Sequence, residues 1–438
     1  MRARSLPSLV AAAVLLAGCG GDDVTPSPPE RSDRAGSSAT PQRPEVPSTE
    51  PTTEPTTDPD APTSWGPTEG ELAEARDIVA GWGPARLAGQ VIVGRYDGTD
   101  PAVAASMVRE LHLAGVSVTS SNVTDAAQVR ATTAAVQRAH AADRRDWPAV
   151  IGVDEEGGTV SHLRGIATEF PAFAAAGAAI AADRRSGQRA VTEAARATAL
   201  ELRGLGFTWV FAPVADVTIG AADPTIGSRS PSPDPALAAA AVVAAVRGYD
   251  DAGLVSTTKH FPGHGSATAD SHETLPALDA TLGQLRRRDL RPFAAAIEAG
   301  APSVMMAHLD VRALQPGTPS SQAAEVYDFL ADDLGFEGVT ITDSLGMGAA
   351  LSRDFPAVRS LRAGADLLLM PVDTATTHRL VTDAIASGQV SRARVEDAAS
   401  QVVALQMWQE RVAGGEPVPA DATARAQRAA ANLTSLGH

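Results

Sequence analysis

The sequence predicts an α/β fold of the (β/α)₈ barrel type, because short strands and longer helices alternate along most of its length. Between the strands lie Ala-, Leu- and Arg-rich segments with helical spacing, such as 188–205 and 235–252. The eight apolar, β-branched runs expected to form strands span residues 90–94, 115–119, 150–153, 208–212, 254–258, 303–307, 339–342 and 367–370. A doubly wound open sheet would also alternate, but no glycine fingerprint follows the first run, which weakens a dinucleotide-binding version.

Composition excludes several classes of function. The chain has 438 residues, with 52 acidic against 36 basic side chains and a formal net charge of −16. This balance argues against nucleic acid as a partner, because phosphate backbones attract basic surfaces. A mean hydropathy of −0.05 argues against a polytopic membrane protein. The single cysteine excludes a disulfide framework within the chain.

The N-terminus resembles a bacterial lipoprotein signal. Arg2 and Arg4 precede the apolar stretch 9–16, which is too short to span a bilayer and leads into Ala17-Gly18-Cys19. We therefore expect residues 1–18 to be a signal peptide and Cys19 to carry a lipid. The protein would then lie outside the cytoplasm on the outer leaflet of the cell membrane, touching the membrane only through its anchor. An ordinary secretory signal with a chance cysteine is the alternative.

Residues 19–66 have the composition of a disordered tether. Ten of the 31 prolines lie in this stretch, which is also rich in Ser and Thr. Too few apolar residues are present to offset the entropy of ordering the backbone. A proline-rich ligand for a partner protein is the alternative. The catalytic domain is accordingly predicted to span residues 67–438.

Polar side chains follow four of the predicted strands. Asp154 comes after the third run, Lys259-His260 after the fifth, His308 after the sixth and Asp343 after the seventh. Active sites of barrel enzymes are assembled from the C-terminal ends of the strands. We therefore expect these residues to converge on one face.

The segment from Lys259 to His272 is the densest cluster of chemically useful residues. Lys259 is the only lysine in the chain, and His260, His264 and His272 follow within thirteen residues. As metal ligands, these histidines and Asp270 would suffice for zinc. However, Pro262 and Gly263 break any helix between His260 and His264.

Acid–base chemistry is the favoured interpretation of the same segment. Asp270 stands two residues before His272 and can orient and charge-stabilise the imidazole. A nucleophile is then required, and Asp343 follows the strand 339–342. On position alone Asp343 is either this nucleophile or a helix N-cap.

Six motifs in order closely resemble the family 3 glycoside hydrolases, specifically their bacterial β-N-acetylglucosaminidase branch in its lipoprotein form. The similarity covers approximately residues 70–410. The motifs are DEEGG at 154–158, FAPVADV at 211–217, GSRS at 227–230, KHFPGHG at 259–265, DSH at 270–272 and TDSLGM at 342–347.

The resemblance implies a role for each matching residue. Asp343 matches the nucleophile that forms a covalent glycosyl-enzyme, and His272, with Asp270 as its partner, matches the general acid/base. Residues matching positions that hold sugar hydroxyls are Asp154, Arg229, Lys259 and His260. No metal and no organic cofactor is implied. The family also predicts cis peptide bonds in the stretch 259–261, which are costly where no proline follows.

The sequence departs from the family pattern at one place. Thr159 and His162 stand where the family often has arginines, and Arg164 follows two residues later. Either His162 or Arg164 would have to replace one guanidinium contact to the sugar. His308 is expected to line the pocket or to support it from the core, and Asp216, Glu155 and Glu156 are expected to be structural.

The resulting prediction is a monomeric, retaining β-N-acetylglucosaminidase that acts on terminal β-linked N-acetylglucosamine from peptidoglycan fragments (muropeptides) in cell-wall turnover. A phosphorylase is an alternative, because a histidine acid/base repels phosphate less than a carboxylate would. A β-glucosidase also stays open, because no residue unambiguously recognises an acetamido group. From other classes, a sugar-binding lipoprotein without turnover and a zinc hydrolase are the competing hypotheses.

Overall fold

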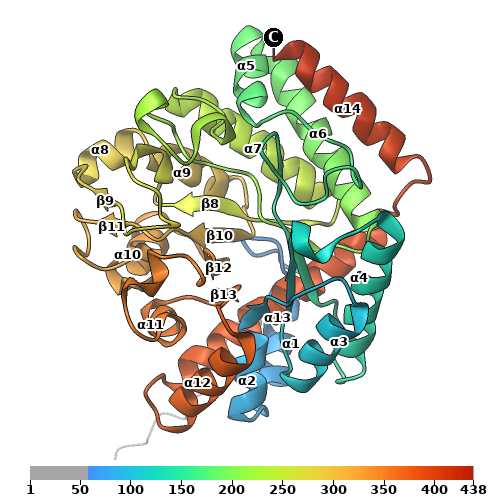
Figure 1. Cartoon of the computed structure of the whole chain (residues 1–438), viewed down its shortest axis with the longest axis vertical. Coiled ribbons are helices and arrows are strands. Elements are labelled where there is room, and N and C mark those ends of the chain that lie inside the picture. Colours follow the sequence, from blue (N-terminus) through green and yellow to red (C-terminus); the bar gives the residue numbers. More distant parts are fainter. Residues whose placement is uncertain (1–57, 438) are drawn as a thin grey trace, which may run out of the picture. The chain divides into compact units, whose positions relative to one another are not determined.

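The computed structural model describes residues 58–437. The predicted signal peptide, Cys19 and most of the predicted tether therefore lie outside the described residues. In the described part, strands lie toward the centre and helices surround them (Figure 1). None of its helices is long and apolar enough to cross a membrane.

Two parallel sheets form the centre of the domain. The larger has the strand order β13-β1-β2-β3-β6-β7 and the smaller has the order β12-β10-β8. The strands of these sheets are β1 Ile92–Gly94, β2 Gly115–Val118, β3 Val150–Val153, β6 Trp209–Val210, β7 Val255–Ser256, β8 Thr258–Phe261, β10 Ser303–Met306, β12 Val339–Thr342 and β13 Leu368–Leu369. Short hairpins and pairs add β4 Glu155–Gly157, β5 Val160–Ser161, β9 Ala277–Leu278 and β11 Asp310–Val311.

Two isolated bridges connect the larger sheet with the smaller one, one beside β13 and one in the segment that follows β6. A parallel bridge joins Ile341 of β12 to Leu367, just before β13, and another joins Val214 to Lys259 of β8. The Thr342 amide donates to the Leu367 carbonyl at 3.0 Å. Every strand neighbour in the two sheets is parallel, so the carboxyl ends of all these strands lie at the same side.

The predicted alternation of strands and helices is confirmed, since each of the eight apolar runs contains a strand. Most of these strands are shorter than the predicted runs. The run 254–258 differs in the other direction, because it contains β7 and is followed by β8, which extends through Lys259 and His260 to Phe261. These polar residues can remain in a strand because buried partners satisfy them, a tertiary effect that local sequence does not reveal.

The helices begin where the sequence provides caps. Asp125, Asp183 and Asp234 accept backbone N–H groups at the starts of α4, α6 and α7. The helices are α1 Glu69–Ala80, α2 Pro84–Gln90, α3 Pro101–Glu110, α4 Ala126–Ala141, α5 Ala174–Ala182, α6 Arg184–Gly204, α7 Pro235–Asp251, α8 Leu282–Arg287, α9 Leu290–Glu298, α10 Ala324–Asp328, α11 Pro356–Ala363, α12 Thr374–Ala386, α13 Arg392–Gly415 and α14 Ala422–Leu436. The predicted helical segments 188–205 and 235–252 correspond to α6 and α7.

The folded part begins earlier than the predicted boundary at residue 67. Trp65 is only 3% exposed and belongs to the main hydrophobic core. Gly66 lies against the ring of Trp408 in α13, and the Ser64 hydroxyl donates to Glu337 at 2.6 Å. Residues 58–66 therefore belong to the domain rather than to a tether, because burial of one large aromatic side chain favours ordering of the segment around it.

The hairpin β4–β5 carries a buried carboxyl group directly after β3. The Leu163 amide donates to Glu155 Oε2 at 3.0 Å, and Glu155 is 6% exposed. Burial raises the pKa of Glu155 to about 7, although hydrogen bonds from Ser161 and Leu163 oppose the shift. The folded chain therefore favours the protonated form of this group.

This raised pKa predicts a pH-dependent stability. Because the folded pKa lies above the unfolded value, the stabilisation is complete below the unfolded pKa and is lost as pH rises through 7. Between pH 5 and pH 8 the wild type should lose about 2 to 3 kcal/mol of unfolding free energy relative to Glu155→Gln. Denaturant titrations at both pH values measure this difference. Parallel pH profiles would contradict it, and Glu74→Gln, an exposed carboxyl on α1, is the control.

Candidate active site

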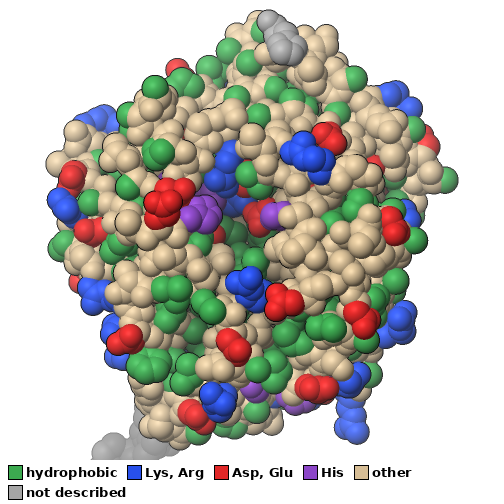
Figure 2. Space-filling model, in the orientation of Figure 1, with side chains coloured by type: hydrophobic (Ala, Val, Ile, Leu, Met, Phe, Trp, Pro, Cys, Tyr) green, Lys and Arg blue, Asp and Glu red, His purple; other side chains and the backbone are tan. Residues whose placement is uncertain are grey.

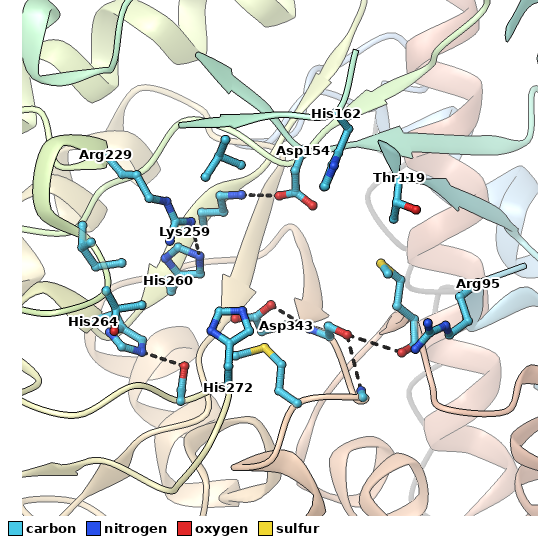
Figure 3. Close-up of a pocket in the computed structure, with 18 residues that line it drawn as sticks. Arg95, Thr119, Asp154, His162, Arg229, Lys259, His260, His264, His272 and Asp343 are labelled. Carbon is cyan, nitrogen blue, oxygen red and sulfur yellow. Dashed lines mark hydrogen bonds and ion pairs between the residues drawn. The ribbon is translucent and has the colours of Figure 1, made fainter. Parts of the chain in front are cut away.

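A pocket of about 460 Å³ opens at the carboxyl ends of the strands. Figure 2 shows this hollow on the face of the domain, with histidine and charged side chains gathered around it. Among its lining residues are six that the sequence analysis selected, drawn in Figure 3: Asp154, Arg229, Lys259, His260, His272 and Asp343. The predicted convergence of strand-end residues is therefore seen for Asp154, Lys259, His260 and Asp343, whereas His308 does not line the pocket.

Glu156 is the centre of a buried ion network behind the pocket. Its Oε1 lies 2.6 Å from Lys259 Nζ, and its two oxygens accept from Arg229 Nη2 and Nε, both at 2.8 Å. Lys259 Nζ also lies 2.5 Å from Asp154 Oδ1. The side chains of Lys259 and Glu156 are only 1% and 2% exposed. One carboxylate thus fixes two cations of the wall.

Mutual compensation keeps these groups charged. Burial would raise the pKa of Glu156, but Lys259 and Arg229 outweigh it and hold the pKa well below the ordinary value. Burial would lower the pKa of Lys259, but Asp154 and Glu156 raise it. The pKa of Arg229 is raised in the same way, since Glu156 outweighs the effect of burial. Glu156 was expected to be merely structural, whereas it sets the charge state and position of two pocket residues.

Asp216 positions the two histidines of the 259–265 segment. Its Oδ2 lies 2.7 Å from His260 Nδ1, and its Oδ1 accepts from the His264 backbone N–H at 2.6 Å. His260 Nε2 in turn lies 3.3 Å from Arg229 Nη2. Asp216 is fully buried, which agrees with its predicted structural role. The Lys259–His260 and Phe261–Pro262 peptide bonds are both cis, as the resemblance predicts for this stretch.

Asp343 lies at the end of β12 with its carboxylate in the pocket. Its backbone N–H donates to the Met306 carbonyl at 2.9 Å, and its Oδ1 accepts from the Ser344 N–H at 2.7 Å. Burial would raise the pKa of Asp343, but the charges of His260 and His308 and the Ser344 N–H together lower it. Asp343 is therefore an anion, as a nucleophile must be.

His272 lies on a loop beside Asp343 and is paired with Asp270. Its Nδ1 is 2.7 Å from Asp270 Oδ1, and its side chain is 62% exposed. Burial opposes ionisation of Asp270, but the N–H and the ring of His272 together outweigh it and lower the pKa of Asp270. The His272 carbonyl accepts from the Gly348 N–H at 3.0 Å, so the loop is bonded to the segment that follows Asp343. Asp270 contacts the imidazole rather than the pocket.

Of the two candidates for the missing guanidinium, only His162 lines the pocket (Figure 3). His162 Nδ1 accepts from the Ser120 N–H at 3.3 Å. Arg164 is directed to Glu169 and to the Gly158 carbonyl and is exposed. His308 lies outside the lining: its ring bonds Ser321 Oγ at 2.7 Å and the Ser344 carbonyl at 2.9 Å. His308 thus holds the segment that follows Asp343 in place through the Ser344 carbonyl.

No three His, Cys, Asp or Glu side chains between residues 58 and 437 are grouped so as to hold a metal ion. The four residues weighed as zinc ligands are instead engaged with other partners. His264 Nε2 bonds Ser271 Oγ at 2.8 Å, His260 bonds Asp216, and His272 bonds Asp270. This arrangement suits proton transfer rather than coordination.

Arg95 is a pocket residue that the sequence analysis missed. It follows β1 directly, as Asp154 follows β3, so its position after an apolar run was the available signal. Arginine is frequent in this chain, with 35 of the 36 basic residues, and no motif marks position 95. Glu156 was also undervalued, because its partners come from segments distant in sequence.

Comparisons with known proteins identify similar sequences and a similar structure. The family described as "Glycosyl hydrolase family 3 N terminal domain" matches residues 88–405. A beta-hexosaminidase of Stenotrophomonas maltophilia is 37% identical over 261 residues, which cover 59% of this chain and 76% of that protein. Beta-hexosaminidase A of Pseudoalteromonas piscicida is 33% identical over 294 residues, which cover 63% of this chain. The match spans only 48% of the length of that second relative.

A solved structure has a similar fold. It is a glycoside hydrolase family 3 beta-N-acetylglucosaminidase from Paenibacillus sp. str. FPU-7, with a TM-score of 0.71 and 31% identity. The similarity covers 79% of this chain and 68% of that one.

The ion network predicts a large effect of neutralising its centre. Glu156→Gln leaves the buried Lys259 and Arg229 without their shared anion and should lower the unfolding free energy by about 3 to 5 kcal/mol. Denaturant titration at pH 7 measures this loss. Glu169→Gln is the matched control, because its pair with Arg164 is exposed and should contribute less than about 0.5 kcal/mol. Equal effects of the two substitutions would contradict a stabilising role for the network.

Proposed function

Because the chain belongs to glycosyl hydrolase family 3, we propose that it is a retaining β-N-acetylglucosaminidase. It would release terminal, non-reducing β-linked N-acetylglucosamine. The observation that carries the proposal is one pocket lined by both the anionic Asp343 and His272, whose ring is bonded to Asp270 behind it. The names of the beta-hexosaminidase relatives and of the beta-N-acetylglucosaminidase structure support this choice of sugar.

The residues opposite Asp343 suit a neutral sugar rich in hydroxyl groups. Lys259 has three N–H donors, and its two carboxylate partners leave one for a sugar hydroxyl. Asp154 Oδ2 and the His260 ring are further groups on this wall. Since the ion network is already assembled, sugar binding requires little reorganisation of these charges.

In the proposed mechanism Asp343 is the nucleophile, and His272, which is paired with Asp270, is the general acid and base. Asp343 attacks the anomeric carbon while His272 donates its proton to the leaving oxygen, so one C–O bond forms as another breaks. His272, now neutral, then takes a proton from water as that water displaces Asp343. Two inversions at one carbon give net retention. Asp270 holds the imidazole and stabilises its charged form.

We also propose that the two sheets constitute one (β/α)₈ barrel. In this interpretation β7 and β8 together form one strand of the barrel, interrupted only at Thr257. The bridges Val214–Lys259 and Ile341–Leu367 then complete the ring. The location of the pocket at the carboxyl ends of the strands supports this architecture.

Peptidoglycan fragments outside the cytoplasm are the proposed source of substrate. The lipobox-like residues 16–19 and the proline-rich composition that follows support this location. Peptidoglycan turnover releases fragments that end in β-linked N-acetylglucosamine, and the proposed activity would remove this terminal sugar.

The activity predicts rapid hydrolysis of 4-nitrophenyl β-N-acetylglucosaminide with the β-anomer as first product. Asp343→Asn should lower kcat by about 10³-fold or more, because the amide cannot serve as the nucleophile. Nitrophenolate release and proton NMR of the first-formed anomer measure these outcomes. Asp279→Asn, an exposed aspartate paired with Arg312, is the control.

The same assay separates the competing functions. Faster turnover of the β-glucoside indicates a glucosidase, and a phosphate-dependent sugar phosphate indicates a phosphorylase. Saturable binding without turnover indicates a binding protein, and loss of activity on chelation indicates a metallohydrolase. Any of these results overturns the proposal.

His272 as general acid predicts an effect that depends on the leaving group. In His272→Ala, kcat/KM should fall by less than about 10-fold for the nitrophenyl substrate, whose phenolate leaves without protonation. For the β-1,4-linked N-acetylglucosamine dimer it should fall by about 10³-fold. Initial rates of both variants and substrates test this, with His378→Ala on α12 as control. Equal losses on both substrates would rule out the acid role.

A further inference from the structure

A second cluster of polar and aromatic side chains lies at the amino ends of β2 and β3. Arg145 Nη1 donates to the carbonyls of His112 and Leu113, at 3.1 and 2.6 Å, just before β2 begins at Gly115. Trp147 lies three residues before β3. Arg145 and Trp147 are only 1% and 6% exposed. Because the strands are parallel, this cluster and the active-site pocket lie at opposite ends of the strands.

One carboxylate, Asp143, balances the cations of this cluster. Its Oδ2 lies 3.4 Å from Arg145 Nε and 3.7 Å from Arg86 Nη2. His112 Nδ1 lies 2.9 Å from the same oxygen. No other carboxylate of residues 58–437 lies within 4.0 Å of either guanidinium. Two guanidiniums therefore share one anion, which leaves an excess of positive charge in a largely buried place.

Several N–H groups of the cluster are buried without an acceptor in the part of the chain that the structure describes. They are Arg145 Nη2, Arg86 Nε and Trp147 Nε1. The two ring nitrogens of His140, a fully buried residue of α4, likewise have no hydrogen-bond partner there. Guanidinium and indole nitrogens can only donate hydrogen bonds, and a buried donor without an acceptor is costly. The missing complement of the cluster is therefore an acceptor.

Aromatic contacts hold these groups in the interior. The rings of Trp82 and Trp147 stack with centroids 6.3 Å apart, and His140 packs edge-on against Trp147, also at 6.3 Å. The Arg86 guanidinium lies over Trp82, 4.6 Å from the ring centroid. Burial and the charge of Arg145 lower the pKa of His140 to about 2, so this ring is neutral. The donors thus keep their places beside one another.

From this arrangement we infer that Arg86, Arg145 and Trp147 bind a small inorganic anion such as chloride. A halide accepts several N–H groups at once and offsets the excess positive charge. Because Arg145 and Trp147 are almost fully buried, a monatomic ion suits the site better than an organic anion. The side chains of Arg86 and His112 are 26% and 35% exposed, so an ion can enter from solvent at this edge. The inference does not rest on the proposed function, because the cluster lies at the other ends of the strands from Asp343.

Urea titrations of the full chain in sodium chloride and in sodium gluconate of equal ionic strength test the inference. Gluconate is a larger, organic anion and should not enter a site of buried side chains. At a concentration ten times its Kd, chloride should lower the equilibrium constant for unfolding by about 10-fold, because it binds only the folded chain. Sodium bromide should act in the same way, and both effects should saturate.

Two tryptophan variants identify the residues responsible. Trp147→Phe removes one N–H donor but keeps an aromatic ring, and it should raise the Kd for chloride by about 10-fold. Trp82→Phe is the matched control, since Trp82 stacks in the same group but its N–H is not among the buried donors without an acceptor. Arg86→Met, which removes a partly exposed cation, should also weaken the response to chloride.

Anomalous diffraction from crystals grown in bromide locates the ion directly, with a peak expected beside Arg145 Nη2 and Trp147 Nε1. Ordered water alone at this place would overturn the inference. Equal stability in chloride and gluconate would also overturn it, and a bromide peak without that dependence would indicate an adventitious ion only. An equal loss of chloride dependence in Trp147→Phe and Trp82→Phe would contradict the assignment of the donors.

Discussion

The pocket depends on one buried carboxylate, Glu156. A lysine that is 1% exposed would lose its proton or unfold the segment around it without an anion at close range. Asp154 and Glu156 both supply an anion to Lys259, and Glu156 alone is shared with Arg229. Because Glu156, Lys259 and Arg229 come from β4, β8 and the turn before Ser230, the network joins segments that are distant in sequence. The wall for the sugar is therefore assembled by charge compensation in the interior rather than by surface loops.

The same network extends toward the catalytic loop through hydrogen bonds. Arg229 contacts His260, which contacts Asp216. Asp216 also receives the backbone N–H of His264, whose ring bonds Ser271, the residue preceding His272. A continuous series of polar contacts thus runs from the binding wall to the acid/base. Since each member is bonded to at least one other residue of the series, the contacts restrict side-chain rotation.

Sequence reasoning predicted the strands, and it selected Asp343 and His272, which lie in one pocket, for a physical reason. Apolar β-branched runs mark buried strands wherever they occur, and Asp343 and His272 lie in short motifs whose spacing is local. Two features escaped it because they depend on distant partners. The strand character of Lys259 and His260 requires Glu156 and Asp216, and Arg95 is held at the pocket by Thr374 of α12. Trp65 escaped for a similar reason, since its surroundings in sequence are proline-rich, while the adjacent Gly66 lies against Trp408, far along the chain.

The different environments of Asp343 and His272 suit the tasks proposed for them. In the proposed mechanism Asp343 presents one oxygen to the anomeric carbon, and its position at the end of β12, bonded to Ser344 N–H, orients its carboxylate. His272 must exchange protons with both a leaving group and water, so its 62% exposure on a loop suits the second step as well as the first. Bonds from Gly348 and Ala349 to the backbone of this loop keep the exposed imidazole near the buried carboxylate. The strand β12 thus fixes the position of Asp343, and the loop gives His272 access to solvent. Two backbone hydrogen bonds hold this loop against the segment that follows Asp343.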